Sequence, residues 1–367
     1  MKRICFYISS HGFGHATREI EIISHLPNEI EVEIVTAAPR WLFERSLERP
    51  FQFREMNHDP GILQRDSLHQ DVESTLAHWQ ELLRLYPALA REEAHHLQTR
   101  NVTLVVGDIS PFAPAVGRAG HIPSVIIANF SWDWIFQVFR SSHPAFGEII
   151  NRIAELYRHT DLLLRTPLSG DLSVFPVIQD IPIVARRSQK TREEARRELG
   201  IAPETKVTLI SLGGHGFNRI PKERLMAYPD ILFLTFLREW SELENVRFLD
   251  PQTTYHPDAL RASDLVLAKM GYGIATECIA HGIPMAYPPR HDFPEHDILE
   301  RETHRHILTL PLSEETFLHG PWDFLNTFFS EDRWGAGRTG ERSIPVDGGE
   351  TAARILGAWA NRDCATP

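Results

Sequence analysis

Short apolar runs rich in β-branched residues alternate along the chain with stretches whose apolar residues recur every three or four positions. Residues 4–8 form the first such run, and Ala16, Ile20 and Ile23 then follow at the spacing of one helix face. A longer helical pattern covers residues 73–96. Further strand-like runs in this half lie at residues 30–35, 104–106 and 125–128. Strands that alternate with helices predict a parallel sheet with helices on both faces.

The same alternation returns in the second half, with strand-like runs at residues 207–211, 231–235, 247–249, 265–268 and 284–287. Between the halves, residues 161–189 are less regular, and the sequence from Thr191 to Glu194 is typical of a capping box that opens a helix. We therefore predict an α/β fold of two doubly wound, Rossmann-like domains, residues 1–185 and 186–349. Ligands of such sheets bind outside the carboxyl ends of the strands, so a cleft between the domains is the expected site.

The end of the chain predicts one more element. Gly348 and Gly349 have the character of a turn, and the apolar spacing that follows predicts a closing helix over about residues 350–367. We expect this helix to pack back on the first domain.

The composition narrows the classes of function. The formal net charge is −11 at pH 7, which disfavours nucleic acid as a partner because nucleic-acid-binding proteins present a basic face. Three widely separated cysteines form neither a metal-ligand spacing nor a disulfide framework, and they favour a reduced, cytoplasmic setting. The apolar run at the N-terminus is too short for a signal peptide, and no run is long enough for a membrane span, although contact with a membrane surface is compatible with the sequence.

The first of three glycine-rich loops follows the first strand and opens the first helix. Its residues His11, Gly12, Gly14 and His15 combine a backbone able to approach a ligand with two imidazoles that exchange protons near neutral pH. The helix N-terminus behind them offers free N–H groups to an anion. The alternative, in which a histidine caps the helix or bonds to the backbone, stays open for each imidazole.

A second glycine-rich loop occupies the matching position in the second domain. Gly213 and Gly214 follow the strand predicted at residues 207–211, and such a turn presents backbone donors to a diphosphate. The alternative is a plain connection, which the matching position in both halves disfavours.

The third loop is the most specific. A strand ends at Lys269, glycines make a tight turn, and Glu277 lies in the first turns of the next helix, where a carboxylate is able to bond the two hydroxyls of a ribose. A polar loop after the following strand is placed to meet a sugar ring. The alternative for Glu277 is an acid that complements the helix dipole. The candidate donor-binding residues of these segments are Lys269, Gly271, Tyr272, Gly273, Thr276, Glu277, Arg290, Asp292 and Glu295.

An aromatic pair follows the strand predicted at residues 125–128. Trp132 and Trp134 are candidates to stack on an acceptor, and Asp133 between them is a candidate hydrogen-bond partner or base. The alternative is that both tryptophans serve in packing and that Asp133 caps a helix.

Taken together, the three loops resemble those of the GT-B glycosyltransferases. The third is similar to the donor-site signature of the UDP-glycosyltransferases and of the peptidoglycan N-acetylglucosaminyltransferase. A closer resemblance covers essentially the whole chain and is to the glycosyltransferase-like N-terminal region of plant L-arabinokinases and its bacterial relatives. The segments that carry it run from Ser10 to Arg18, Asn129 to Asp133, Gly271 to Gly273 and Asp347 to Glu350. The sugar-kinase half of those proteins has no counterpart in this sequence.

The resemblance implies how a nucleotide-diphosphate sugar is held. Glu277 occupies the place of the family's ribose-binding acid, and the diphosphate turn falls on residues 273–276. Gly213 and Gly214 match the other phosphate-facing loop. Asp292 and Glu295 fall near the family's donor-sugar contacts, although the usual acid–Gln ending is absent.

The resemblance also implies a base on the first-domain side. His15 aligns with the family's catalytic histidine, and Asp108 aligns with the aspartate that orients it, a pair suited to activating a hydroxyl. Asp133 is a rival base. The chain contains no Asp-x-Asp, which favours transfer without a metal, and Lys269 stands where retaining enzymes of this fold often carry a glutamate, which favours inversion.

The predicted function is transfer of a sugar from a nucleotide-diphosphate sugar, with a UDP-sugar as the expected donor and a small molecule, lipid or glycan as the acceptor. No cofactor is expected. Two alternatives stay open: a nucleotide-sugar epimerase of the same fold, and a sugar-nucleotide sensor without turnover.

Overall fold

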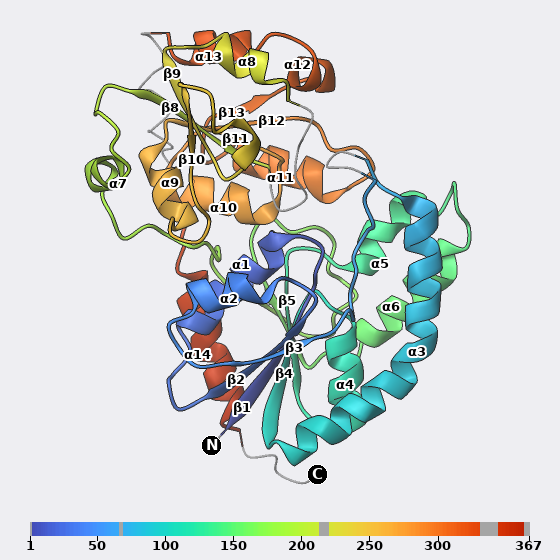
Figure 1. Ribbon diagram of the computed structural model, residues 1–367. Coiled ribbons are helices and arrows are strands. Elements are labelled where there is room, and N and C mark those ends of the chain that lie inside the picture. The colour runs from blue at the N-terminus through green and yellow to red at the C-terminus, as the bar shows by residue number, and fades with distance from the viewer. Residues whose placement is uncertain (1, 66–68, 213–219, 331–343, 363–367) are drawn as a thin grey trace.

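A computed structural model describes residues 2–65, 69–212, 220–330 and 344–362. Within these residues two separate parallel sheets form, and they face each other from two domains (Figure 1). β7 is the last strand of the first sheet along the chain and ends at Asp180. β8 is the first strand of the second sheet and begins at Lys206. The predicted α/β architecture of two doubly wound sheets is confirmed.

The first sheet has the order β3-β2-β1-β4-β5-β6-β7 in the described residues. Its strands are β1 (Arg3–Ile8), β2 (Glu31–Thr36), β3 (Gln52–Glu55), β4 (Val102–Asp108), β5 (Ser124–Ala128), β6 (Leu162–Arg165) and β7 (Ile178–Asp180). The helices of this part are α1 (Phe13–Ser24), α2 (Arg40–Ser46), α3 (Val72–Thr99), α4 (Phe112–Gly120), α5 (Trp132–Ile135), the 3-10 helix η1 (Phe136–Phe139) and α6 (Phe146–Tyr157).

Alternate residues of the strands feed two cores, one on each face of this sheet. Ile4, Phe6 and Ile8 of β1 pack with α1, α2 and the C-terminal helix α14 (Gly348–Ala360). Cys5 and Tyr7 belong to the core on the opposite face, with residues of α3, α4 and α6. Figure 1 shows these three helices on one side of the sheet and α1, α2 and α14 on the other. Both faces are therefore apolar, as the continuous apolar character of a buried parallel strand requires.

The second sheet has the order β10-β9-β8-β11-β12-β13 in the described residues. Its strands are β8 (Lys206–Ser211), β9 (Ile231–Thr235), β10 (Val246–Phe248), β11 (Leu265–Ala268), β12 (Met285–Tyr287) and β13 (Thr309–Pro311). Helices α7 (Arg192–Glu198), α9 (His256–Ala262), α10 (Tyr272–His281) and α11 (Glu295–Thr303) cover one face, and α8 (Lys222–Met226), α12 (Glu314–Leu318) and α13 (Asp323–Phe328) cover the other, with the 3-10 helix η2 (Arg238–Trp240) after β9.

Four of the described strands, β3, β6, β7 and β13, were not predicted from the sequence. β6 and β7 lie inside residues 161–189, which the prediction treated as irregular. β7 is an exposed strand at the sheet edge, and β3, at the opposite edge, is only partly buried. Edge strands lack the apolar run that marks a central strand, because one side of the strand has no neighbour.

The turn predicted at Gly348 and Gly349 is wrong, because these glycines are the first two residues of α14. The backbone N–H of Gly348 donates to the carbonyl of Ile183 at 3.0 Å, so the helix start lies against the segment that links the domains. A Cβ on Gly349 would lie 2.8 Å from Cγ of Glu21 in α1. Glycine is therefore needed here for close packing of α14 on the first domain.

The thirteen-residue α14 returns from the second domain and packs against α1, as the sequence led us to expect of the closing helix. Thr191 and Glu194 form the predicted capping box at the start of α7. Among the described helices, including the 28-residue α3, none combines the length and apolar character of a membrane span.

Candidate functional site

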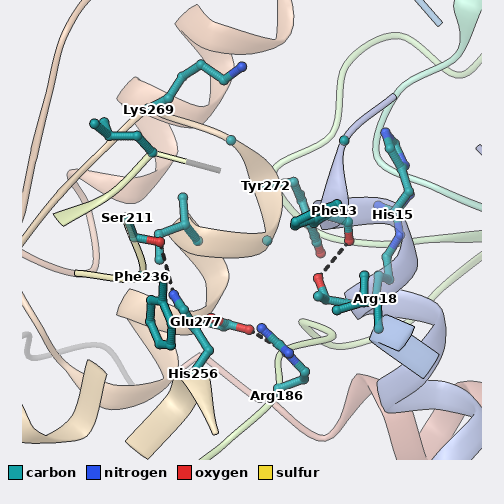
Figure 2. A pocket seen from close by; sticks show the side chains of 18 of the residues that line it. Phe13, His15, Arg18, Arg186, Ser211, Phe236, His256, Lys269, Tyr272 and Glu277 are labelled. Atoms are coloured by element: carbon teal, nitrogen blue, oxygen red, sulfur yellow. Dashed lines mark hydrogen bonds and ion pairs between the residues drawn. The ribbon is translucent and has the colours of Figure 1, made fainter. Parts of the chain in front are cut away.

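A cavity of about 660 Å³ lies between the two domains and is called the cleft below. The first domain contributes the turn from β1 into α1 and part of α2. The second contributes residues that follow β8, β9, β10, β11 and β12. Figure 2 shows His15 and Arg18 on the first-domain side and Lys269, His256 and Glu277 on the other. Both sheets thus present their carboxyl ends to one space, where ligands of this fold class bind.

Two helix N-termini meet at the cleft. The N-cap residues are Gly12 for α1 and Gly271 for α10, and neither helix has a side-chain cap. A Cβ on Gly273 would lie 3.3 Å from the Cα of Gly14, so these glycines allow the two helix starts to approach closely. The free N–H groups of both turns are available to an anion in the cleft.

His15 and Asp108 come together on the first-domain side, as the sequence predicted. His15 Nδ1 lies 2.7 Å from Oδ1 of Asp108, which is fully buried at the end of β4. Because a carboxylate only accepts, Nδ1 carries the proton and the lone pair is on Nε2. His15 lines the cleft, so the pair has the arrangement of a base and the group that orients it.

Arg18 completes this cluster, and sequence reasoning missed it. Its Nε donates to Asp108 Oδ2 at 2.9 Å and its Nη2 donates to Oδ1 at 2.6 Å. Burial acts to raise the pKa of Asp108, but the Arg18 and His15 side chains outweigh burial and hold that pKa below its usual value. Asp108 therefore stays ionised in a fully buried position. The spacing of three residues from His15 on α1 was the available signal, because it puts both side chains on one helix face.

Glu277 lies on the second-domain side with two basic partners. Arg186 Nε donates to its Oε1 at 2.8 Å, and His256 Nδ1 lies 3.0 Å from Oε2. Burial acts to raise the pKa of Glu277, but Arg186 and His256 more than offset it and lower the pKa to about 2. The carboxylate lines the cleft and is fixed as an anion. Each of its oxygens has a second lone pair for a ligand hydroxyl.

Lys269 and Arg290 form a cationic region of the cleft. Burial, together with the charge of Arg290, lowers the pKa of Lys269 to about 7. Burial also lowers the pKa of Arg290 to about 10. Arg290 stacks over the ring of Phe293, and its Nη2 lies 3.2 Å from Nε2 of His11. Two desolvated cations in one cavity favour an anionic ligand, because an anion would relieve the cost of burying their charge.

Glu295 and Asp292, both candidates for sugar contacts, are placed differently. Glu295 is buried at the start of α11 and lines the cleft, and its Oε1 accepts a bond of 2.6 Å from Asn129 Nδ2. Asp292 is exposed, has a φ of 55° and is absent from the cleft wall. The geometry therefore supports a ligand contact by Glu295 and gives none to Asp292.

Comparison with known proteins supplies the fold. No model of a known protein family matches the chain. CalG4, the calicheamicin glycosyltransferase, superposes with a TM-score of 0.62 at 14% identity, covering 100% of both chains. MurG of Acinetobacter baumannii superposes with a TM-score of 0.57 at 12% identity, covering 97% of this chain and 99% of MurG. A UGT transferase of Siraitia grosvenorii in complex with UDP gives 0.59 at 13% identity, covering 99% of this chain and all of that one.

The chain has the GT-B fold. Among curated proteins it is 31% identical to the L-arabinokinase of Arabidopsis thaliana over 98% of its own length and 35% of that protein. The chain thus spans about a third of that relative. The resemblance inferred from the glycine-rich loops agrees with both comparisons.

The aromatic candidates lie outside the cleft of this GT-B chain. Trp132 is fully buried and donates its indole N–H to Asp59 Oδ2 at 2.9 Å. Trp134 packs against Gly170, because a Cβ added to Gly170 would lie 2.6 Å from the Trp134 ring. Asp133 lies in the first turn of α5, and burial raises its pKa. None of Trp132, Asp133 and Trp134 lines the cleft, which favours the packing alternative over contact with an acceptor.

The remaining candidates for donor binding divide into three groups. Gly271, Tyr272 and Gly273 line the cleft. Thr276 is buried behind it and donates to the carbonyl of Gly273 at 3.0 Å. Gly213 and Gly214 lie outside the described residues. Within the described part of the chain, no three histidine, cysteine or acidic side chains cluster so as to hold a metal ion, and transfer without a metal stays a prediction.

Sequence reasoning also missed a group of residues near Glu277. Phe236 follows β9 directly and stacks on His256, with ring centroids 5.5 Å apart, and both line the cleft. His256 opens α9 after β10, so the rule that ligands lie at carboxyl ends of strands was sufficient to select both. Arg186 lies in the segment between the domains and had no local signal.

Proposed function

We propose that this chain is a glycosyltransferase that moves a sugar from a nucleotide-diphosphate sugar to the hydroxyl of an acceptor, with a UDP-sugar as the expected donor. The observation that carries the proposal is a cleft with two unlike walls. Lys269, Arg290 and the uncapped start of α10 form an anion-binding wall, and His15 with Asp108 forms a proton-accepting wall. A similar structure, Phytolacca americana UGT2, was solved with UDP-2fluoro-glucose and pterostilbene.

The donor is proposed to lie along the carboxyl ends of the second sheet. Its diphosphate would accept bonds from the N–H groups at the start of α10 and from Lys269, and Arg290 would balance the remaining charge. Glu277 would accept from the ribose hydroxyls through lone pairs that Arg186 and His256 leave free. The same basic partners fix the carboxylate before the ligand arrives, so little ordering is needed on binding.

Catalysis is proposed to be a single displacement. His15 Nε2 would accept the proton of the acceptor hydroxyl while that oxygen attacks the anomeric carbon. The bond from the anomeric carbon to the diphosphate oxygen breaks, and the nucleoside diphosphate leaves with the electron pair. Asp108 would stabilise the imidazolium that forms, and the cationic wall would stabilise charge on the leaving group. Attack from the face opposite the diphosphate inverts the anomeric centre and needs no metal.

The test combines turnover with binding. His15→Ala is expected to lower kcat by about 100-fold or more, in the range that a general base contributes, while UDP affinity changes by less than about threefold. His95→Ala is the matched control, because His95 is exposed on α3 and away from the cleft. Near-wild-type turnover by His15→Ala would refute the assignment of the base.

The alternatives are separable in the same assay. An epimerase would convert a UDP-sugar without any acceptor, and a sensor would bind the nucleotide sugar without converting it. The matched relative is named a kinase, so phosphorylation of L-arabinose by ATP is measured as well. Any of these three results, in the absence of sugar transfer, would overturn the proposed function.

A further inference from the structure

One buried hydrogen bond joins the base cluster of the first domain to the second domain. Asn129 follows β5 and is fully buried, and Glu295 opens α11 and is 4% exposed. The bond from Asn129 Nδ2 to Glu295 Oε1 is 2.6 Å long and links residues 166 positions apart. Other polar contacts between the domains, such as Arg290 with His11 and Gln70 with the carbonyl of Asp292, are partly buried or exposed.

The Asn129 amide also contacts Arg18. Arg18 Nη1 donates to Asn129 Oδ1 at 2.9 Å, while Nε and Nη2 of the same guanidinium hold both oxygens of Asp108. Asp108 in turn accepts from His15. A continuous buried chain therefore runs from His15 through Asp108, Arg18 and Asn129 to Glu295.

The chemistry of this chain fixes the orientation of the amide. Arg18 can only donate and the Glu295 carboxylate can only accept, so the Asn129 oxygen must face Arg18 and its nitrogen must face Glu295. A side chain at this position must both accept and donate, and leucine or alanine would leave two buried polar groups without partners. The contact with Glu295 exists only while α11 is seated against the first domain.

We propose that Asn129 is a positioning residue that makes the orientation of the His15–Asp108 pair depend on the seating of the second domain. If Glu295 withdraws, Asn129 loses the partner that holds its amide, and Arg18 then loses a fixed acceptor for its third bond. Asp108, and with it the His15 ring, would have fewer constraints. The base would thus reach its working geometry only when the donor-binding domain is in place. This proposal rests on the proposed transferase function.

The experiment uses a polarity swap in the full-length chain. Asn129→Asp keeps an acceptor for Arg18 but sets a carboxylate against Glu295. Glu295→Gln supplies a donor, so the double variant N129D/E295Q restores a bonded chain with the polarity of that link reversed. We expect N129D to lower kcat by at least tenfold with less than threefold change in UDP affinity. We expect the double variant to recover kcat to the level of E295Q alone. Asn151→Asp, the same change at an exposed position on α6, is the control.

A second readout needs no turnover. The imidazole resonances of His15 in uniformly histidine-labelled protein, assigned with His15→Ala, are expected to move in N129D and to return in N129D/E295Q at the same pH. Should N129D fail to fold, Asn129→Ala is measured in its place and is expected to move the same resonances and lower kcat. Normal kcat together with unchanged His15 resonances would overturn the inference. Moved resonances in a chain that transfers no sugar would overturn the proposed function and leave the positioning role of Asn129 supported.

Discussion

Replacing Lys269 by methionine removes one of the two cations that face the cleft, and the structure predicts the consequence in detail. Burial and the neighbouring Arg290 lower the pKa of Lys269 to about 7, so this lysine loses its charge in a range where ordinary lysines keep theirs. The charge of Glu295 acts to raise the pKa of Lys269, but burial and Arg290 outweigh it. A diphosphate would be the partner of Lys269, and binding would favour the charged form.

The size of the effect follows from the bond that is lost. A hydrogen bond to a charged group contributes about 1.5–3 kcal/mol, so Lys269→Met should weaken binding of UDP-glucose by about 10- to 150-fold at pH 6. Because the charged form binds, wild-type affinity should be constant below about pH 6 and should fall as the pH rises through 7. In Lys269→Met this fall should disappear. Arg290 keeps its charge across this range, because its pKa is about 10.

The assay is isothermal titration calorimetry with UDP-glucose at several pH values from about 6 to 8.5, where its doubly esterified diphosphate does not change charge. Lys222→Met is the control, because Lys222 lies at the surface on α8, and it should keep both the affinity and the pH dependence. Wild-type affinity that does not fall with pH would refute the reasoning. Equal affinity of Lys269→Met and the wild type at pH 6 would refute it as well.

Further predictions concern stability, measured by urea unfolding. Glu277→Ala leaves Arg186 and His256 without their buried anion and should cost about 3–5 kcal/mol, whereas Glu277→Gln keeps an acceptor and should cost less. Equal losses in the two variants would contradict the ion-pair account. Gly348→Ala would place a Cβ 2.6 Å from a backbone oxygen of the segment between the domains and should cost about 1–3 kcal/mol. Gly357→Ala in the same helix meets nothing closer than 3.6 Å and should be neutral or stabilising, so similar losses in both glycine variants would show that α14 tolerates no alanine for another reason.

The central strands and the positions of the glycine turns were predictable from sequence because their signals are local. A buried parallel strand is an apolar run, and a turn that follows it contains glycine where the backbone must approach closely, as Gly14 and Gly273 do. A local signal does not predict the pairing of His15 with Asp108, because 93 residues separate them in the sequence. The pairing was predicted only from the resemblance to the glycosyltransferases. The structure supplies the physical reason, because β1 and β4 are neighbouring strands whose carboxyl ends lie side by side.

Arg186 and Asn129, which sequence reasoning missed, owe their place to tertiary contacts without a local signal. Arg186 reaches Glu277 across 91 residues, and Asn129 reaches Glu295 across 166. An arginine such as Arg18 is ordinarily expected at the surface, and its burial follows only from the carboxylate that receives it. Conversely, Trp132 was a candidate for acceptor binding because aromatic residues often stack on ligands. In the structure its large side chain packs in the core of the first domain.

The central claim is that the cleft binds a nucleotide-diphosphate sugar through the second domain. The most direct measurement is a thermal-shift screen of nucleotide-diphosphate sugars against the wild type and Glu277→Gln. A ligand present at about 100 times its Kd should stabilise the wild type by about 2.7 kcal/mol, and the same ligand should stabilise Glu277→Gln clearly less. A screen in which no nucleotide-diphosphate sugar stabilises the wild type, or in which the best ligand stabilises both proteins equally, would contradict the claim.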